Sequence, residues 1–193
     1  MAAAAASLPD LRNAIQAFDG CALKLTATNL VFADGASDAD LLFVGEAPGR
    51  DEDLKGLPFV GRSGHLLDRM LAAIGRDRTS AYIRNVLPWR PPGNRTPTPE
   101  EMARCVPFLL RHIELSGAKI VVALGGVAAK QLLDTTTGIM RLRGTWQTLR
   151  LPEGRLVPVL PTFHPAYLLR QPAHKALAWR DFQEVRRRLA GPT

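Results

Sequence analysis

The segment that most constrains the fold spans residues 40–64, where a short apolar run leads into two glycine-rich turns. Four consecutive apolar residues at 41–44 are too few for a helix and suit a buried strand. Gly45 and Pro48 then end the strand in a tight loop that carries a single acid, Glu46. Open α/β sheets bind ligands where a strand ends in such a loop. We therefore expect a ligand site here, with an ordinary strand and turn as the alternative.

A second loop at residues 56–61 holds one aromatic residue, Phe59, between Pro58 and Gly61. An aromatic ring on a stiff loop offers a flat face to a planar ligand, although a phenylalanine that only packs in the core is the simpler interpretation. Three carboxylates, Asp51, Glu52 and Asp53, lie between the two loops.

Hydrophobic periodicity predicts alternating strands and helices along the chain. The predicted strands cover residues 41–44, 82–87, 119–124 and 156–160, and the predicted helices cover residues 8–18, 62–74, 98–115, 126–133 and 175–189. Thr98, Pro99 and Glu101 form the capping box that starts the third helix. Pro158 is expected to place the fourth strand at a sheet edge. Residues 135–155 fit either a loop or a hairpin.

This alternation predicts an α/β protein of one domain over residues 1–193. The expected architecture is a three-layer α/β/α sandwich around a central, mainly parallel four-stranded sheet. Residues 1–7 contain an alanine run, which we expect to be a disordered tail.

The predicted strands also bring polar residues to one place, because parallel strands end at one edge of a sheet. The first strand leads to Glu46, the second carries Asn85 and the fourth leads to His164. Each residue alone has an ordinary structural explanation. Together they predict a carboxylate, an amide and an imidazole beside Phe59.

Charge points to a polyanionic partner. Of the charged residues from position 141 onward, ten are basic and three acidic, and this excess equals the net charge of +7 of the whole chain. Such a basic surface attracts phosphate, although a solvated helix face rich in arginine explains it equally well. No apolar run reaches the ~20 residues of a membrane span. We expect a cytoplasmic, nucleoid-associated protein that does not bind membranes.

The sequence lacks the motifs that are typical of several other classes of enzyme. It contains no Gly-x-x-x-x-Gly-Lys phosphate loop, no Gly-x-Ser-x-Gly elbow and no His-Glu-x-x-His metal pair. The two cysteines, Cys21 and Cys105, are too few for a disulfide framework or a four-thiolate metal site.

Four ordered motifs carry a family resemblance. From about Asp19 to its end, the chain resembles the family 4 uracil-DNA glycosylases. The motifs are GEAPGRDED at 45–53, GLPFVG at 56–61, RPPGNRTP at 90–97 and HPAYLLR at 164–170. The resemblance implies an enzyme that flips uracil out of DNA and hydrolyses its N-glycosidic bond, releasing free uracil and leaving an abasic site.

The resemblance also implies roles for individual residues in binding uracil. Phe59 would stack on the flipped base, and Asn85 would accept from N3–H and donate to O4. His164 would donate to O2, where negative charge develops as the base leaves. Backbone groups around Gly45 and Ala47 would complete the pocket.

Catalysis and DNA contact complete the implied roles. Glu46 is the leading candidate for steadying the sugar cation or holding the attacking water, with Glu52 and Asp53 as runners-up. The segment 165–170 is expected to be a loop that presses into the duplex. The residues expected to contact DNA are Arg62, Arg95, Tyr167, Leu168, Leu169 and Arg170, with Tyr167, Leu168 or Leu169 as the wedge.

One departure from the family is large. The resemblance to family 4 implies an iron–sulfur cluster that is held by four cysteines. Here Cys21 and Cys105 match two of the ligand positions, but Phe18 and Trp89 stand at the other two. Neither side chain can bind iron, so we expect no metal and no cofactor. Phe18 and Trp89 are expected to fill the vacated space by apolar packing.

The expected protein is thus a monofunctional, cluster-free and monomeric uracil-DNA glycosylase. Two alternatives remain open at this point. One is a glycosylase for other deaminated bases, such as hypoxanthine or xanthine. The other is a DNA-binding relative that has lost catalysis.

Overall fold

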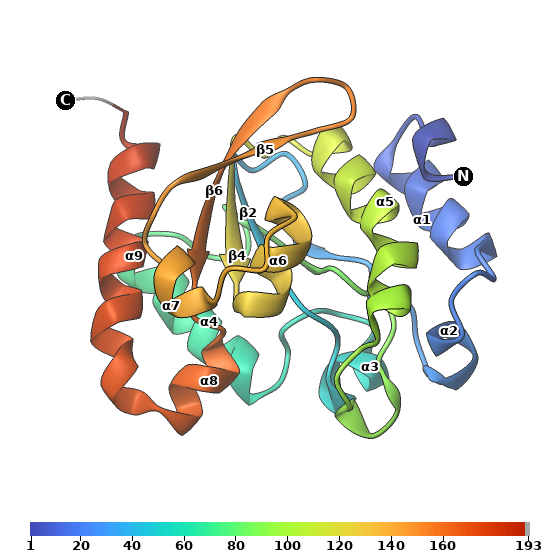
Figure 1. Cartoon of the computed structure of the whole chain (residues 1–193), viewed down its shortest axis with the longest axis horizontal. Helices are drawn as coiled ribbons and strands as arrows, with labels where there is room; N and C mark the ends of the chain where they lie inside the picture. The colour runs from blue at the N-terminus through green and yellow to red at the C-terminus, as the bar shows by residue number, and fades with distance from the viewer. Residues whose placement is uncertain (192–193) are drawn as a thin grey trace.

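The computed structural model describes residues 1–191 and contains one six-stranded sheet with the order β1–β3–β2–β4–β6–β5 (Figure 1). The last two residues of the predicted domain lie outside the described residues. The strands are β1 (Asp34–Gly35), β2 (Leu41–Gly45), β3 (Tyr82–Asn85), β4 (Ile120–Leu124), β5 (Gln147–Arg150) and β6 (Leu156–Thr162). The four inner strands run parallel, and β1 and β5 pair antiparallel at the edges.

The expected four-stranded sheet was therefore too small. The four parallel strands form where they were predicted, but β1 has only two residues and β5 alternates exposed with buried residues, so neither contains an apolar run. Pro158 does not mark an edge, because β5 pairs along β6 and Pro158 lies opposite Thr148. Pro158 precedes the part of β6 that pairs with β4, which begins at Val159. Its missing N–H therefore falls outside the parallel ladder.

Helices cover both faces of this sheet. The α-helices are α1 (Leu8–Ala17), α2 (Leu23–Thr26), α3 (Arg50–Lys55), α4 (Arg62–Ala73), α5 (Pro99–Leu115), α6 (Gly126–Leu133), α7 (Ile139–Leu142), α8 (Pro165–Arg170) and α9 (Lys175–Leu189). Three 3₁₀ turns are η1 (Ala2–Ala4), η2 (Pro92–Asn94) and η3 (Pro172–His174). The helices predicted from periodicity form within about one residue of their expected ends.

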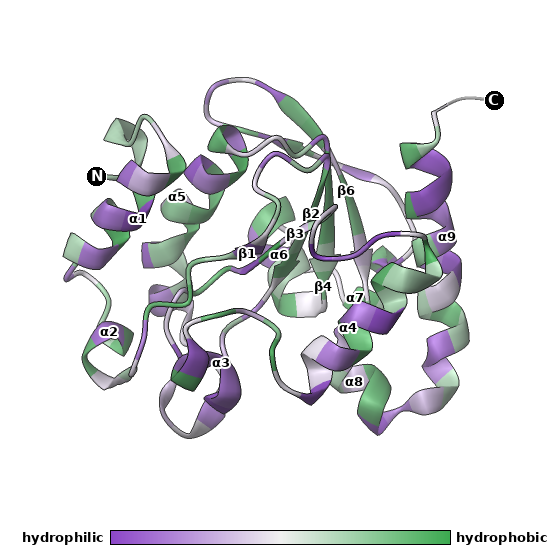
Figure 2. Cartoon of the chain, turned by 180° about the vertical axis from the view of Figure 1, so that it is seen from behind, coloured by the Kyte–Doolittle hydropathy of each residue, from purple (hydrophilic) through white to green (hydrophobic). Residues whose placement is uncertain are grey.

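Alternate residues of the inner strands pack on opposite layers. Leu42 and Val44 of β2 lie in a core with α1, α5 and α6, whereas Leu41 and Phe43 lie in a second core with α4 and α9. Figure 2 shows the strands as an apolar centre with polar residues spread over the outer helices. Because both faces are buried, these strands are continuous apolar runs, as a parallel sheet requires. The three-layer α/β/α sandwich is confirmed.

The structure contains one helix that was not predicted and orders one segment that was expected to be disordered. Residues 50–55 form helix α3, and Glu52 caps that helix by accepting from the N–H of Gly49. The first residues were expected to be a disordered tail. Instead, Ala2 and Ala5 are buried, and Arg111 of α5 donates two hydrogen bonds to the carbonyl of Ala5. Polyalanine has no periodicity that could have revealed this packing.

The capping box predicted for α5 is present. The Thr98 hydroxyl accepts from the N–H of Glu101 at 3.2 Å, and the Glu101 carboxylate accepts from the N–H of Thr98 at 2.8 Å. No helix within residues 1–191 is long and apolar enough to span a membrane.

Candidate functional site

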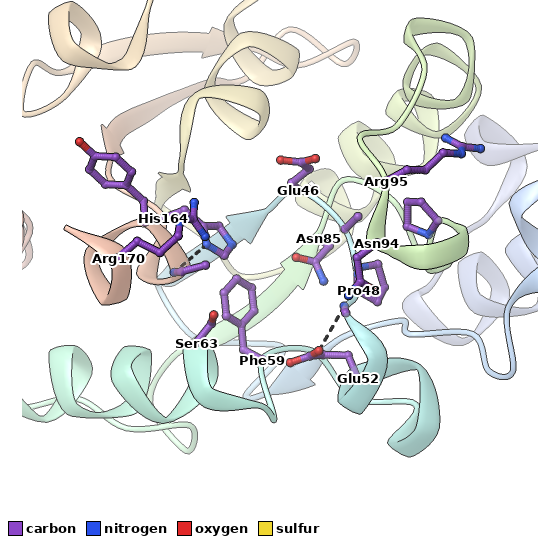
Figure 3. A pocket seen from close by; sticks show the side chains of 15 residues that line it. Glu46, Pro48, Glu52, Phe59, Ser63, Asn85, Asn94, Arg95, His164 and Arg170 are labelled. Atoms are coloured by element: carbon purple, nitrogen blue, oxygen red, sulfur yellow. Dashed lines mark hydrogen bonds between the residues drawn. The ribbon is translucent and has the colours of Figure 1, made fainter. Parts of the chain in front are cut away.

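A cavity of about 520 Å³ opens at the carboxyl edge of the parallel strands. Its walls come from the segments that follow β2, α3, β3 and β6. Figure 3 shows the side chains of Phe59, Asn85 and His164 around one space, with Glu46 at the end of β2. The four residues that the sequence predicted to converge therefore line the same cavity.

The ring of Phe59 forms a fixed wall of the cavity. Phe59 has a left-handed backbone, with φ of 54°, and is only 4% exposed. Arg78 holds this strained conformation by donating to the carbonyls of Pro58, at 3.1 Å, and of Phe59, while its guanidinium also pairs with Asp34 and Asp68. Non-glycine residues at positive φ persist only where the surroundings impose them, and here those contacts do so.

Gly45 allows the ring and the amide to approach each other. A Cβ on Gly45 would lie 2.4 Å from Oδ1 of Asn85 and 2.6 Å from Cζ of Phe59, so no other residue fits without displacing both. Gly45 and Asn85 are also register partners in the β2–β3 ladder. The ladder therefore sets their spacing.

Asn85 faces the cavity with an unsatisfied acceptor. Its side chain is buried, and Oδ1 has no hydrogen-bond partner among the described residues. Buried polar atoms are paired in the great majority of cases, because an unpaired one costs about 1–3 kcal/mol. An unpaired acceptor that faces a cavity points to a ligand that carries a donor.

His164 presents a defined tautomer to the same space. The N–H of Ala166 donates to Nδ1 of His164 at 3.0 Å, so Nδ1 carries no proton and the neutral ring keeps its proton on Nε2. Burial, together with the positive charge of Arg170, lowers the pKa of His164 to about 4. The imidazole is thus a neutral hydrogen-bond donor at neutral pH. Its ring lies 5.5 Å from that of Phe59.

Glu46 is the one carboxylate of the predicted set that has no hydrogen bond to the protein in the described structure and also lines the cavity. Burial raises its pKa above the ordinary value. A partly desolvated carboxylate can stabilise positive charge or orient water, because its oxygens remain free.

The two runner-up acids have structural partners instead. Glu52 lines the cavity, but its oxygens accept from the N–H groups of Gly49, Val60 and Gly61 and so join the two loops. Asp53 is buried away from the cavity, where it accepts from the N–H groups of Thr28 and Asn29. The structure does not bring Asp53 to the site.

The residues expected to contact DNA fall into two groups. Tyr167, Arg170 and Arg95 line the cavity, and Arg62 is exposed at the start of α4. Arg95 pairs with both oxygens of Glu101, and this contact lowers the pKa of Glu101 to about 2.

The segment expected to be a loop that carries the wedge is the short helix α8, capped by His164. Leu168 is 1% exposed and packs with Phe163 and Ala178, so it cannot enter a duplex as predicted. Leu169 and Tyr167 are only partly buried and remain available for that role.

Sequence reasoning missed several residues that line the cavity, among them Ser63, Pro91 and Asn94. Asn94 lies within the RPPGNRTP motif and has φ of 56°, while its side chain accepts from Arg90 at 2.7 Å. The motif marked this segment as part of the family pattern, but nothing in the sequence predicted that the segment lies at the same cavity as Glu46. Nothing in the sequence marked Ser63 as a site residue, because it lies at the start of an amphipathic helix.

The positions that would hold an iron–sulfur cluster do not fit one. Cys21 and Cys105 are both buried, and burial raises the pKa of the Cys105 thiol, which the neighbouring Cys21 raises further. Trp89 is buried in the same core, and Phe18 packs on Phe108 with ring centroids 4.9 Å apart. Two buried cysteines among apolar rings cannot supply the four thiolates that a cluster requires. Within residues 1–191, no group of three His, Cys, Asp or Glu side chains could hold a metal ion.

Comparison with known proteins shows the family to which the chain belongs. The family model described as the uracil DNA glycosylase superfamily matches residues 32–183. A type-4 uracil-DNA glycosylase of Archaeoglobus fulgidus is 43% identical over 93% of this chain and 92% of its own length. One from Thermotoga maritima is 46% identical over 78% of this chain and 77% of its own length, and one from Sulfurisphaera tokodaii is 36% identical over 93% and 84%. The chain therefore belongs to the uracil DNA glycosylase superfamily.

Proposed function

We propose that this protein hydrolyses the N-glycosidic bond of uracil in DNA, releasing free uracil and leaving an abasic site. The observation that carries the proposal is the unpaired Oδ1 of Asn85, which faces a cavity beside the Phe59 ring and the Nε2–H of His164. The relatives named type-4 uracil-DNA glycosylase support the same activity.

Base recognition follows from these groups. A uracil stacked on Phe59 offers its N3–H to Oδ1 of Asn85 and its O4 to the amide N–H. Cytosine has the opposite donor and acceptor at these two atoms, so it would leave the buried amide mispaired.

Departure of the base requires stabilisation of its charge. Uracil leaves as an anion with charge on O2, and the Nε2–H of His164 donates to that oxygen. The neutral ring avoids protonating the base too early, and its orientation is fixed by the N–H of Ala166. The carboxylate of Glu46 stabilises the positive sugar or orients the water that attacks it.

The bond is unreachable within a stacked duplex, so the nucleotide must leave the helix before reaction. Arg170, Arg62 and Arg95 contact phosphates around the cavity mouth. Tyr167 or Leu169 of α8 occupies the space that the flipped base vacates. We further propose that the protein is a single-domain, monomeric cytoplasmic enzyme of the nucleoid.

Replacing Asn85 with alanine should lower the single-turnover rate of uracil release at least about 100-fold, because the paired amide is lost in a desolvated site. The measurement is release from an oligonucleotide with one uracil. Asn13→Ala, an exposed asparagine of α1, is the matched control and should keep the wild-type rate. Equal, negligible release by the wild type and Asn85→Ala would instead identify a DNA-binding protein without this activity.

Replacing Phe59 with alanine should weaken inhibition by free uracil by about 1–3 kcal/mol of binding free energy, since base–aromatic stacking is lost. Phe59→Leu keeps most of the bulk without a flat face and should show most of the same loss. An unchanged inhibition constant in both variants would contradict stacking on this ring.

The rate of release should not fall as pH rises from about 6 to 9. The lowered pKa of His164, about 4, leaves its ring neutral throughout this range, and the donating proton on Nε2 is retained. A fall is expected only on acidification, as first Glu46, with its raised pKa, and then His164 become protonated. A rate that drops as pH rises through about 6.5, the ordinary pKa of histidine, would mean that the imidazolium is required.

We propose that the enzyme works without an iron–sulfur cluster, a proposal that the apolar residues Phe18 and Trp89 support. Protein purified without air should contain less than about 0.1 iron per chain and lack the broad visible absorbance of a cluster. It should release uracil at full rate in the presence of an iron chelator. Stoichiometric iron that disappears together with activity would overturn the proposal.

A further inference from the structure

Arg84 is a buried cation next to the residue that would recognise the base. Its side chain is 1% exposed, and no ion pair within residues 1–191 includes it. Burial lowers the pKa of Arg84 to about 10, so the guanidinium is still charged at neutral pH. Burying a charge without a partner of opposite sign destabilises a fold. Stability alone therefore does not account for an arginine here.

The guanidinium instead makes two contacts with backbone carbonyls. Nε donates to the carbonyl of Asn85 at 2.9 Å, and Nη1 donates to the carbonyl of Phe108 on α5 at 3.4 Å. Asn85 is the last residue of β3. Arg84 therefore holds the peptide group at the end of this strand and joins it to α5.

These contacts matter because the Asn85 side chain has no anchor of its own. Its Oδ1 has no protein partner, so the position of the amide depends on the backbone from which it projects and on the packing of Gly45 and Phe59. Small displacements of a recognition group from its working position are costly to reaction rates.

The location of Arg84 adds a second argument. Phe108, whose carbonyl it contacts, packs in the same core as Cys105 and Trp89. Arg84 therefore joins the end of β3 to α5 beside this core.

We propose that Arg84 is a positioning residue, which sets the Asn85 amide for base recognition by holding the Asn85 carbonyl against helix α5. This inference rests on the proposed function, because it assigns Arg84 a part in reading the base. Arg84 itself touches no substrate.

The test is a double-mutant cycle between Arg84 and Asn85. Arg84→Met keeps an unbranched side chain but removes the charge and its hydrogen bonds, and Arg84→Lys keeps the charge without the planar donors. Tyr82→Phe is the matched control. Tyr82 lies on the same face of β3 and hydrogen-bonds with His112 of α5 at 2.9 Å, so its loss loosens the same interface without reaching Asn85.

Four quantities are measured for each variant: uracil release in a single turnover, inhibition by free uracil, affinity for abasic DNA, and the urea midpoint of unfolding. Arg84→Met and Arg84→Lys should release uracil at least tenfold more slowly and bind free uracil severalfold more weakly, with abasic-DNA affinity unchanged within twofold. Tyr82→Phe should lower the urea midpoint but keep its rate within twofold. In an Asn85→Ala background, Arg84→Met should change the remaining rate and uracil binding by less than twofold.

Equal fold losses in both backgrounds would overturn the proposal, because Arg84 would then act without Asn85. A folded Arg84→Met with wild-type rate and uracil affinity would also overturn it. If Arg84→Met does not fold, Arg84→Lys carries the same cycle and the same criteria. A wild type that releases no more uracil than Asn85→Ala overturns the proposed function itself, and the present proposal with it. That outcome is visible without any Arg84 variant.

Discussion

The site depends on one steric constraint, the absence of a side chain at Gly45. The Phe59 ring and the Asn85 amide both come within 3 Å of where a Cβ would lie. Parallel pairing of β2 with β3 brings Gly45 and Asn85 opposite each other, and the loop that follows α3 supplies the ring. An aromatic face and a carboxamide can therefore share one small space, while the loop after β6 adds His164.

Charged side chains hold the loops around the cavity in place through hydrogen bonds to their backbone. Glu52 joins the two loops around it by accepting from three backbone N–H groups, and Arg78 holds the carbonyls of Pro58 and Phe59. These charged groups form hydrogen bonds with the backbone, whereas the oxygens of Glu46 remain free. Identical residue types thus play different parts, and the hydrogen-bond partner of each one decides which.

Much of this arrangement could be predicted from sequence. Four apolar runs and their intervening amphipathic helices predicted the parallel core, and the shared edge of the predicted strands predicted that Glu46, Asn85 and His164 would meet. Neither β1 nor β5 has an apolar run, so the edges were missed. The acids at 51–53 are adjacent in sequence, and only the fold separates Glu52 at the cavity from Asp53 behind it. Likewise, Leu168 and Leu169 differ only in which side of α8 meets the core.

The left-handed backbone of Phe59 has a consequence for how a base is met. Its conformation is imposed by Arg78, which itself is held by Asp34 and Asp68 from two other segments. The ring is therefore already oriented before a base binds, and the entropic cost of ordering it falls on folding and not on binding. A preorganised wall of this kind favours lock-and-key recognition, in which extruded bases are inspected against a rigid template without induced fit.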